Sequence, residues 1–366
     1  MRHYLIAGVV AIVCVGGAAV PAWAQAKGSA EASAAAVANP KWTGPKLSWG
    51  HPDLEGIWTS DDMRGVPMSR PQQFGSRQSL NDEEFAARAR ERAEARRVDD
   101  ARTGTFRNEE GSRDFGYTSL VIEPADGRIP AFTAEARTLP TPRGTGGVGP
   151  FNSIDDFSLW DRCITRGLAG SWLPVVYGNG TRIIQTPDSV IIAHEMVHET
   201  RVIPLDPSTS SGSPRAESRG DGRGHMGAAI KQYMGVSRGH WDGNTLVIET
   251  TNFTDRIAAT GGGGVRFSDA LKTTERITRI DPHMVELELR VDDPKTYVAP
   301  WTLRMTLTSQ PGYEIYEYGC HEGNRSVPNA LSGERVYEKQ AAENAAKGLP
   351  PPERVFEKVN GDDRGR

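Results

Sequence analysis

The sequence predicts a mainly β protein: an antiparallel meander of hairpins that closes into a lipocalin-like barrel or packs as a two-sheet sandwich, with one N-terminal and one C-terminal helix. Three observations lead to this fold class. Glycine (40 residues) and proline (24 residues) are frequent in the chain of 366, which favours strands and turns over long helices. Short apolar runs alternate with turn signals from Trp172 onward. Within the clearest runs, apolar and polar residues alternate with a period of two.

The chain begins with the pattern of a secretory signal peptide over residues 1–24. Met1-Arg2-His3 is a short basic start, residues 5–20 are apolar, and Ala22-Trp23-Ala24 supplies a cleavage site. We therefore expect a periplasmic or secreted protein. No integral membrane segment is expected, because no other run approaches the roughly 18 apolar residues that a membrane helix needs. Residues 25–50 are expected to form a flexible leader.

Residues 51–335 are expected to fold as a single β-barrel domain. Asn81 is a good N-cap for one solvated helix at about residues 82–97, and acidic residues in its first turn complement the helix dipole. A last helix is expected from about residue 333. It ends within residues 336–366, whose remainder is Pro-rich and charged and is expected to be a disordered tail.

The hairpins of the barrel have recognisable turn signals. Asp242-Gly243 is a strong type I′ signal between two strands, residues 234–241 and 244–251. In the strand predicted at residues 284–292, apolar side chains share one face and charged side chains share the other. An open sheet of about eight to ten strands leaves two exposed edges, which is why we expect a closed barrel or two packed sheets.

His194-Glu195-Met196-Val197-His198 matches the H-E-x-x-H pattern of zinc metalloproteases. In such an enzyme both histidines project from one helix onto a single zinc, and the glutamate polarises the bound water. The β-branched neighbours, and turn residues at Pro187 and Pro204, favour one strand over residues 189–203 instead. Histidines four residues apart on a strand lie about 13 Å apart, too far for one metal. We therefore expect no metal site here.

On that strand His194 and His198 share one face, and Glu195 lies on the other face. His194 is interpreted as an exposed or hydrogen-bonded strand residue. Polar residues in an apolar strand cost free energy unless they are paired or used. Glu195 and His198 are therefore candidate catalytic residues, and Arg201 is a candidate substrate-binding residue.

Of the three cysteines, signal cleavage leaves Cys163 and Cys320, which in an oxidising compartment most simply form one disulfide. That bridge would bring His321 and Glu322, as candidate catalytic residues, close to Asp161 and Arg162, as candidate substrate-binding residues. A histidine, a carboxylate and an arginine that holds an anionic oxygen make an acid–base constellation. The alternative is a structural ion-pair network around the disulfide.

His240 and Trp241, at a hairpin tip, are further candidates for substrate binding, as walls for a ligand; ordinary packing is the alternative. A net charge of −4 argues against a nucleic-acid partner. No cofactor is expected, because the chain has no phosphate-binding loop or dinucleotide fingerprint at a strand end. The sequence leaves the oligomeric state open.

Several longer motifs carry a resemblance to a known family. They are Pro52-Asp53-Leu54-Glu55-Gly56-Ile57-Trp58, Asp161-Arg162-Cys163, Ile184-Gln185-Thr186-Pro187, Glu195-Met196-Val197-His198 with Arg201-Val202-Ile203-Pro204-Leu205-Asp206, Gly239-His240-Trp241-Asp242-Gly243-Asn244-Thr245-Leu246-Val247, and Cys320-His321-Glu322-Gly323-Asn324. Over residues 50–335 the chain resembles a family of secreted bacterial proteins of unassigned function. The resemblance implies that His194 completes the zinc-protease pattern by chance. Gly56-Ile57-Trp58 also resembles the G-x-W signature of lipocalins.

We expect an exported β-barrel that encloses a small, mostly apolar or aromatic molecule. It could act on that molecule as a cofactor-free lyase, isomerase or hydratase through His/Glu/Arg acid–base chemistry. The first alternative is a non-catalytic ligand-binding or envelope structural protein. The second alternative is a zinc metalloprotease.

Overall fold

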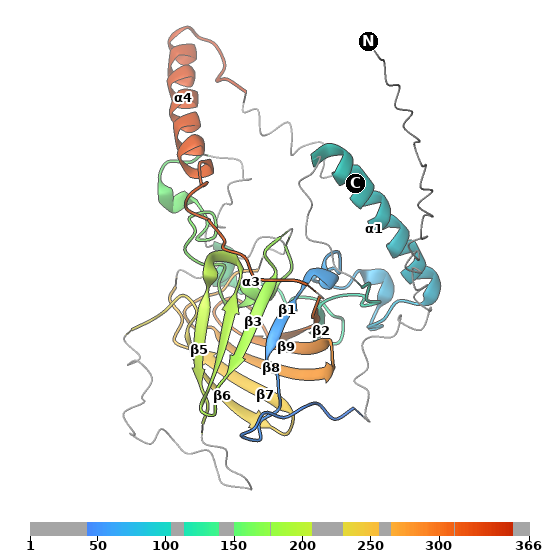
Figure 1. Ribbon diagram of the computed structural model, residues 1–366. Coiled ribbons are helices and arrows are strands. Elements are labelled where there is room, and N and C mark those ends of the chain that lie inside the picture. Colours follow the sequence, from blue (N-terminus) through green and yellow to red (C-terminus); the bar gives the residue numbers. More distant parts are fainter. Residues whose placement is uncertain are drawn as a thin grey trace, which may run out of the picture.

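The structure is a computed structural model that describes residues 42–103, 113–138, 150–175, 177–206, 230–255, 265–310 and 312–353. The predicted signal peptide, most of the predicted leader and the end of the predicted tail lie outside these residues. The described part is mainly β, as expected, with ten strands in one antiparallel sheet (Figure 1). None of the described helices is both long enough and apolar enough to cross a membrane.

The strands are β1 (Gly56–Thr59), β2 (Val121–Glu123), β3 (Gly180–Gln185), β4 (Ser189–His194), β5 (Thr200–Pro204), β6 (Val236–Asp242), β7 (Thr245–Thr251), β8 (Lys272–Asp281), β9 (Met284–Asp292) and β10 (Trp301–Thr308). The helices are α1 (Asp82–Thr103), α2 (Ala134–Thr138), α3 (Leu168–Trp172) and α4 (Ser326–Ala346). Nine strands follow one path of neighbours, β5-β4-β3-β1-β10-β9-β8-β7-β6, and β2 pairs with β10 beside that path.

The period-two alternation of apolar and polar residues, predicted from the sequence, correctly locates the hydrophobic core. In β9, Val285, Leu287, Leu289 and Val291 are all fully buried. They join the inward-facing residues of β3, β4, β5, β7 and β10 in one hydrophobic cluster, so both halves of the sheet contribute to the same core. The Asp242-Gly243 hairpin between β6 and β7 is confirmed, with Gly243 at a φ of 61°.

The predicted closure into a barrel is wrong, because the sheet is not closed. A ring of antiparallel strands needs an even number of members, whereas a path of nine leaves its end strands, β5 and β6, running in the same direction. These two strands meet at a single isolated parallel bridge between Leu205 and Gly239. Asp206 N also donates to Gly239 O at 2.8 Å. The two edges therefore touch without forming a ladder.

The single strand predicted over residues 189–203 is also wrong. The chain reverses between β4 and β5, and both Val197 (φ 64°) and His198 (φ 54°) have left-handed backbone conformations there. These conformations are uncommon for residues other than glycine, and β-branched composition does not reveal them. The H-E-x-x-H segment is thus a hairpin turn. His194 ends β4 and faces inward, whereas His198 lies exposed in the turn, so the two histidines do not share a face.

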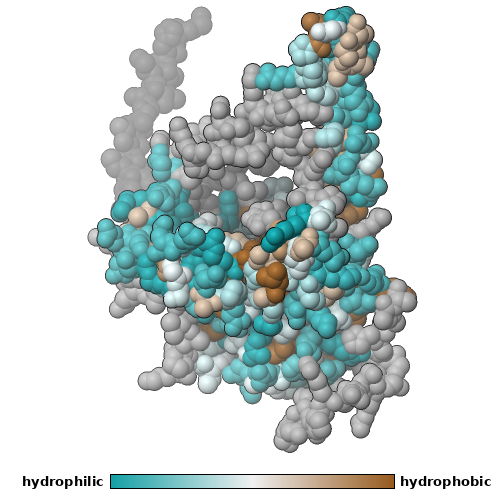
Figure 2. Space-filling view, turned by 180° about the vertical axis from the view of Figure 1, so that it is seen from behind, coloured by the Kyte–Doolittle hydropathy of each residue, from teal (hydrophilic) through white to brown (hydrophobic). Residues whose placement is uncertain are grey.

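The helices lie at the ends of the sheet and outside it. Asn81 caps α1 as predicted: Glu84 N donates to Asn81 Oδ1 and Asn81 N donates to Glu84 Oε2, both at 2.9 Å. The last helix, α4, begins earlier than predicted and projects from the body (Figures 1 and 2). Its first turn buries Val327 against Phe151 and Phe157. Figure 2 shows a largely hydrophilic face with apolar residues in small groups.

Candidate functional site

One end of the sheet interior is polar. The side chains there come from six strands and are all buried. They are Thr181 on β3, His194 on β4, Arg201 on β5, Ser237 on β6, Thr250 on β7, and Thr273 and Glu275 on β8. We call this set the inner polar layer. The short helix α3, whose five residues are all buried, packs directly on it through Trp172.

Arg201 and Glu275 form the ion pair of this layer. Arg201 Nη1 donates to Glu275 Oε2 at 2.8 Å and Arg201 Nη2 donates to Glu275 Oε1 at 2.6 Å. Trp172 Nε1 donates to Glu275 Oε1 at 2.6 Å. A buried charge needs such a partner, because an unpaired one is very costly. Arg201, predicted from the sequence as a binding residue, thus lies inside the protein with its charge matched.

His194 contacts two members of the site. Its Nδ1 shares a hydrogen bond of 3.0 Å with Thr181 Oγ1, and Trp172 packs edge-on against its ring with the centroids 4.8 Å apart. Burial, with the positive charges of Arg201 and Arg166, holds the pKa of His194 well below its usual range. The imidazole is therefore neutral near pH 7, with one nitrogen bonded to Thr181.

The other ring nitrogen carries the main signal of the site. His194 Nε2 is buried and has no hydrogen-bond partner among the described residues, and the same is true of Thr273 Oγ1 and Arg201 Nε. A buried polar atom left without a partner costs about 1–3 kcal/mol. Three such atoms in one layer make it the candidate binding site.

A second pair of charges lies between this layer and the surface. Glu199 accepts hydrogen bonds from the Thr165 hydroxyl, from Arg166 N at 3.3 Å and from Ser171 Oγ at 3.2 Å. Burial raises the pKa of Glu199, although these hydrogen bonds oppose the shift. Burial lowers the pKa of Arg166 to about 10, and its guanidinium lies 5.2 Å from the centre of the Trp160 ring.

Glu195 and His198, predicted as catalytic, hold another part of the chain. Residues 312–320, which we call the strap, connect β10 to the disulfide. Glu195 accepts from the Tyr313 hydroxyl and from Tyr316 N at 3.3 Å, and His198 Nε2 accepts from Tyr318 N at 2.9 Å. The β4–β5 turn is therefore a clamp for the strap. The turn also lacks the helix on which a zinc protease would carry its two histidines.

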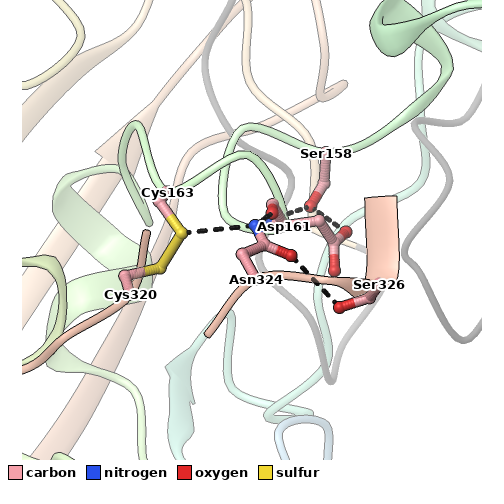
Figure 3. Close-up of a disulfide and its surroundings, with 6 residues drawn as sticks. All are labelled: Ser158, Asp161, Cys163, Cys320, Asn324 and Ser326. Atoms are coloured by element: carbon pink, nitrogen blue, oxygen red, sulfur yellow. Dashed lines mark hydrogen bonds between the residues drawn. A yellow bond between two sulfur atoms is a disulfide. The ribbon is translucent and has the colours of Figure 1, made fainter. Parts of the chain in front are cut away.

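The predicted disulfide between Cys163 and Cys320 is present and closes a separation of 157 residues (Figure 3). The contacts beside it come mainly from Asn324. Its Nδ2 donates to Asp161 O at 2.6 Å and lies 3.5 Å from Cys163 Sγ, while Ser158 Oγ donates to Asp161 Oδ2 at 2.5 Å. A disulfide fits the oxidising compartment that the sequence predicts.

The acid–base constellation expected around this disulfide does not form. His321 and Glu322 lie exposed in a turn directly after Cys320. Within the described residues no hydrogen bond or ion pair joins their side chains to Asp161 or Arg162. Arg162 pairs with Asp155 at 3.1 Å instead. The bridge brings the two segments together, but the turn directs these two side chains to solvent.

His240 and Trp241 lie toward the other end of β6. Trp241 is four positions from Ser237 along the strand, which is about 13 Å at the usual rise. Trp241 packs on the core and lies 5.4 Å, between ring centres, from His51. Trp241 therefore packs as a core residue there. The aromatic wall at the inner polar layer is Trp172, which the sequence did not single out.

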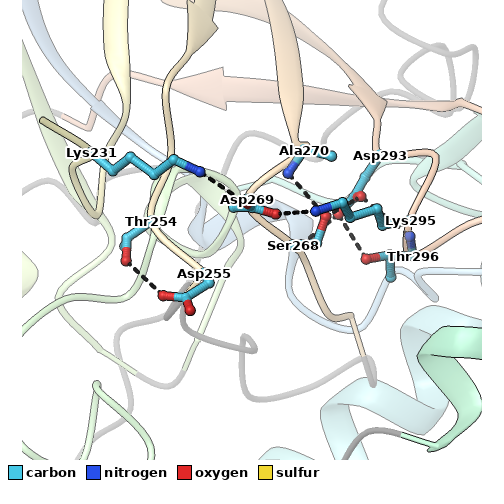
Figure 4. Close-up of polar contacts among 9 residues, drawn as sticks. All are labelled: Lys231, Thr254, Asp255, Ser268, Asp269, Ala270, Asp293, Lys295 and Thr296. Carbon is cyan, nitrogen blue, oxygen red and sulfur yellow. Dashed lines mark hydrogen bonds and ion pairs between the residues drawn. The ribbon is translucent and has the colours of Figure 1, made fainter. Parts of the chain in front are cut away.

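A further polar cluster joins the loops before β6 and β8 to the one after β9 (Figure 4). Asp269 accepts from Lys231 Nζ at 2.6 Å and from Lys295 Nζ at 2.8 Å, and these bonds lower its pKa to about 2. Asp293 accepts from Ser268 N and Oγ, both at 2.6 Å. These bonds tie the loops together, so we interpret the cluster as structural.

No protein-family model, no curated protein and no solved structure matches this chain. The family resemblance of the sequence therefore stays an expectation.

Proposed function

We propose that this protein binds a small molecule inside the curved sheet. The inner polar layer would hold the polar group of the molecule, and the inward-facing apolar side chains would contact its body. The observation that carries this proposal is the buried Nε2 atom of His194, which has no partner among the described residues. Export of the protein to the periplasm or beyond remains part of the proposal.

The surroundings of the layer support a ligand with an apolar body. Three isoleucines face inward on the strands that carry the layer: Ile192 on β4, Ile203 on β5 and Ile277 on β8. All three are fully buried. Binding sites for small molecules are typically apolar with a few polar groups that fix orientation. The layer and these isoleucines have that composition.

We propose that the protein binds its small molecule, and we favour this over catalytic turnover of that molecule. Of the four predicted catalytic residues, His198, His321 and Glu322 are exposed. The fourth, Glu195, is bonded to the strap. Turnover as a cofactor-free lyase or isomerase is less favoured at the layer, because burial holds the pKa of His194 well below its usual range and leaves a weak base. The competing function is an envelope structural protein, in which the layer would only stabilise the fold.

The test compares ligand content in two variants. The full-length protein would be exported, purified from the periplasm and examined by native mass spectrometry and by analysis of extracted small molecules. His194→Phe keeps an aromatic ring beside Trp172 but removes both nitrogens. His283→Phe, an exposed histidine bonded to Ser309, is the matched control.

We expect the parent protein and His283→Phe to carry the same molecule. We expect His194→Phe to bind it about tenfold more weakly, the upper range for one lost hydrogen bond. A parent protein with no bound molecule, together with a His194→Phe variant that is clearly less stable to heat, would support the structural alternative instead.

A further inference from the structure

The charges around the inner polar layer balance. Arg201 is paired with Glu275 through both terminal nitrogens. The Glu199 carboxylate accepts a hydrogen bond from Arg166 N at 3.3 Å, and its negative charge opposes the burial that lowers the pKa of Arg166. The two arginines and the two glutamates carry equal and opposite formal charges.

An ionised ligand would disturb this balance. Glu275 already supplies the counter-charge of Arg201 and bonds to both of its terminal nitrogens, so a second carboxylate there would be an unmatched charge. A carboxylate or ammonium group taken from water into a buried site is strongly disfavoured unless a charged partner is waiting for it. In the inner polar layer the guanidinium of Arg201 already has its carboxylate partner in Glu275.

The atoms without partners are suited to a neutral group. His194 is a neutral imidazole, so its Nε2 either donates or accepts, according to the tautomer. Thr273 Oγ1 can do both. Arg201 Nε carries a fixed proton and can only donate. A ligand group that bonds to Arg201 Nε must accept a hydrogen bond, and it needs no charge to do so.

We infer that the molecule bound at the inner polar layer has an apolar body and a neutral hydrogen-bond-accepting group, a hydroxyl or a carbonyl, and is neither a carboxylate nor an amine. The inference rests on the proposed function. It names the chemical class of the ligand, which the proposal of binding leaves open.

The experiment uses two series of probes with one body each. The first is 1-decanol, 2-decanone, decanoate and decylammonium. The second is 2-acetonaphthone, 2-naphthoate and 2-naphthylmethylammonium. Dissociation constants would be measured at pH 7 on the full-length protein stripped of bound molecules, by calorimetry and by quenching of tryptophan fluorescence.

We expect the neutral members to bind at least tenfold more tightly than the charged members of the same series. If a carboxylate or an ammonium binds as tightly as its neutral counterpart, the inference is wrong while the proposed function stands. If no member of either series binds and the protein carries no molecule from the cell, both are wrong.

A variant that changes the charge of the layer provides a second arm of the experiment. Glu275→Gln leaves Arg201 without its counter-charge, and we expect the preference to invert, with decanoate then at least tenfold tighter than 1-decanol. Glu288→Gln, on the outer face of the neighbouring strand β9, is the matched control and should leave the preference unchanged.

Glu275→Gln can fail to fold, because it breaks a buried ion pair. The double variant Arg201→Met with Glu275→Met removes both charges together and keeps the layer neutral. We expect it to bind 1-decanol in preference to decanoate, as the parent does. A double variant that prefers decanoate would overturn the inference, since the preference would then not follow the charge of the layer.

Discussion

His194 is the residue on which this account depends. It ends β4, faces the interior and is bonded through one nitrogen only. In the sequence it looked like an accidental part of a zinc-protease pattern. Its importance comes from burial, because a half-satisfied imidazole in the interior is costly whereas the same imidazole at the surface is not.

The pH dependence of stability should report the burial of His194. Burial lowers its pKa below the ordinary value of 6.5. Below pH 6.5 the unfolded chain binds a proton at this residue while the folded protein does not, so stability falls as the pH drops from 6.5 towards the folded-state pKa. His194→Gln should lose this component, which is worth up to about 1.4 kcal/mol per pH unit.

The measurement is the free energy of unfolding in urea at pH 7.5 and at pH 5.5. The control is His283→Gln, whose imidazole is exposed. Glu199 contributes with the opposite sign, because burial raises its pKa, but it is common to all three proteins. Equal losses in the parent and in His194→Gln would show that His194 is not buried in this way.

At the residue scale the sequence revealed some of the site and hid the rest. Arg201 could be singled out, since an arginine in an apolar strand needs a partner. Its partner, Glu275, lies 74 residues away on β8, and only the sheet topology shows which strands face each other. The alternation of Thr273, Glu275 and Ile277 was the available signal, because it places Glu275 on the inward face of β8.

The β4–β5 turn is the element that most changes the interpretation of the sequence. It joins two strands where one was predicted, and it clamps the strap. Gly180 allows this, because a Cβ atom there would lie 2.6 Å from Glu195 Oε2 and 2.9 Å from the Tyr313 ring. Turn geometry of this kind depends on contacts with distant segments, which local composition does not contain.

Removing the clamp should loosen the strap. Glu195→Ala deletes the acceptor of bonds from Tyr313, Tyr316 and Gly180, and we expect a loss of about 1–3 kcal/mol in stability. Hydrogen exchange by mass spectrometry should rise in peptides that cover residues 312–320. Glu317→Ala, an exposed position in the same strap, should leave exchange as in the parent. If Glu195→Ala leaves it unchanged too, the clamp does not hold the strap.

For the whole molecule, the β class, the meander of hairpins and the disulfide followed from local patterns. Closure did not, because it depends on a global count. Whether the ends of a sheet can pair is decided by the number and direction of all strands between them, and here β5 and β6 run parallel. The sheet still encloses one core, with the inner polar layer at the end beneath α3.

The most direct test of the account is a high-resolution crystal structure of the protein purified in its exported form from cells. We expect density for one small molecule inside the sheet, with a neutral polar atom within about 3.2 Å of His194 Nε2 and its body against the inward-facing apolar residues. A His194 Nε2 bonded to a protein atom, or to an enclosed water with protein partners on every side, would contradict it.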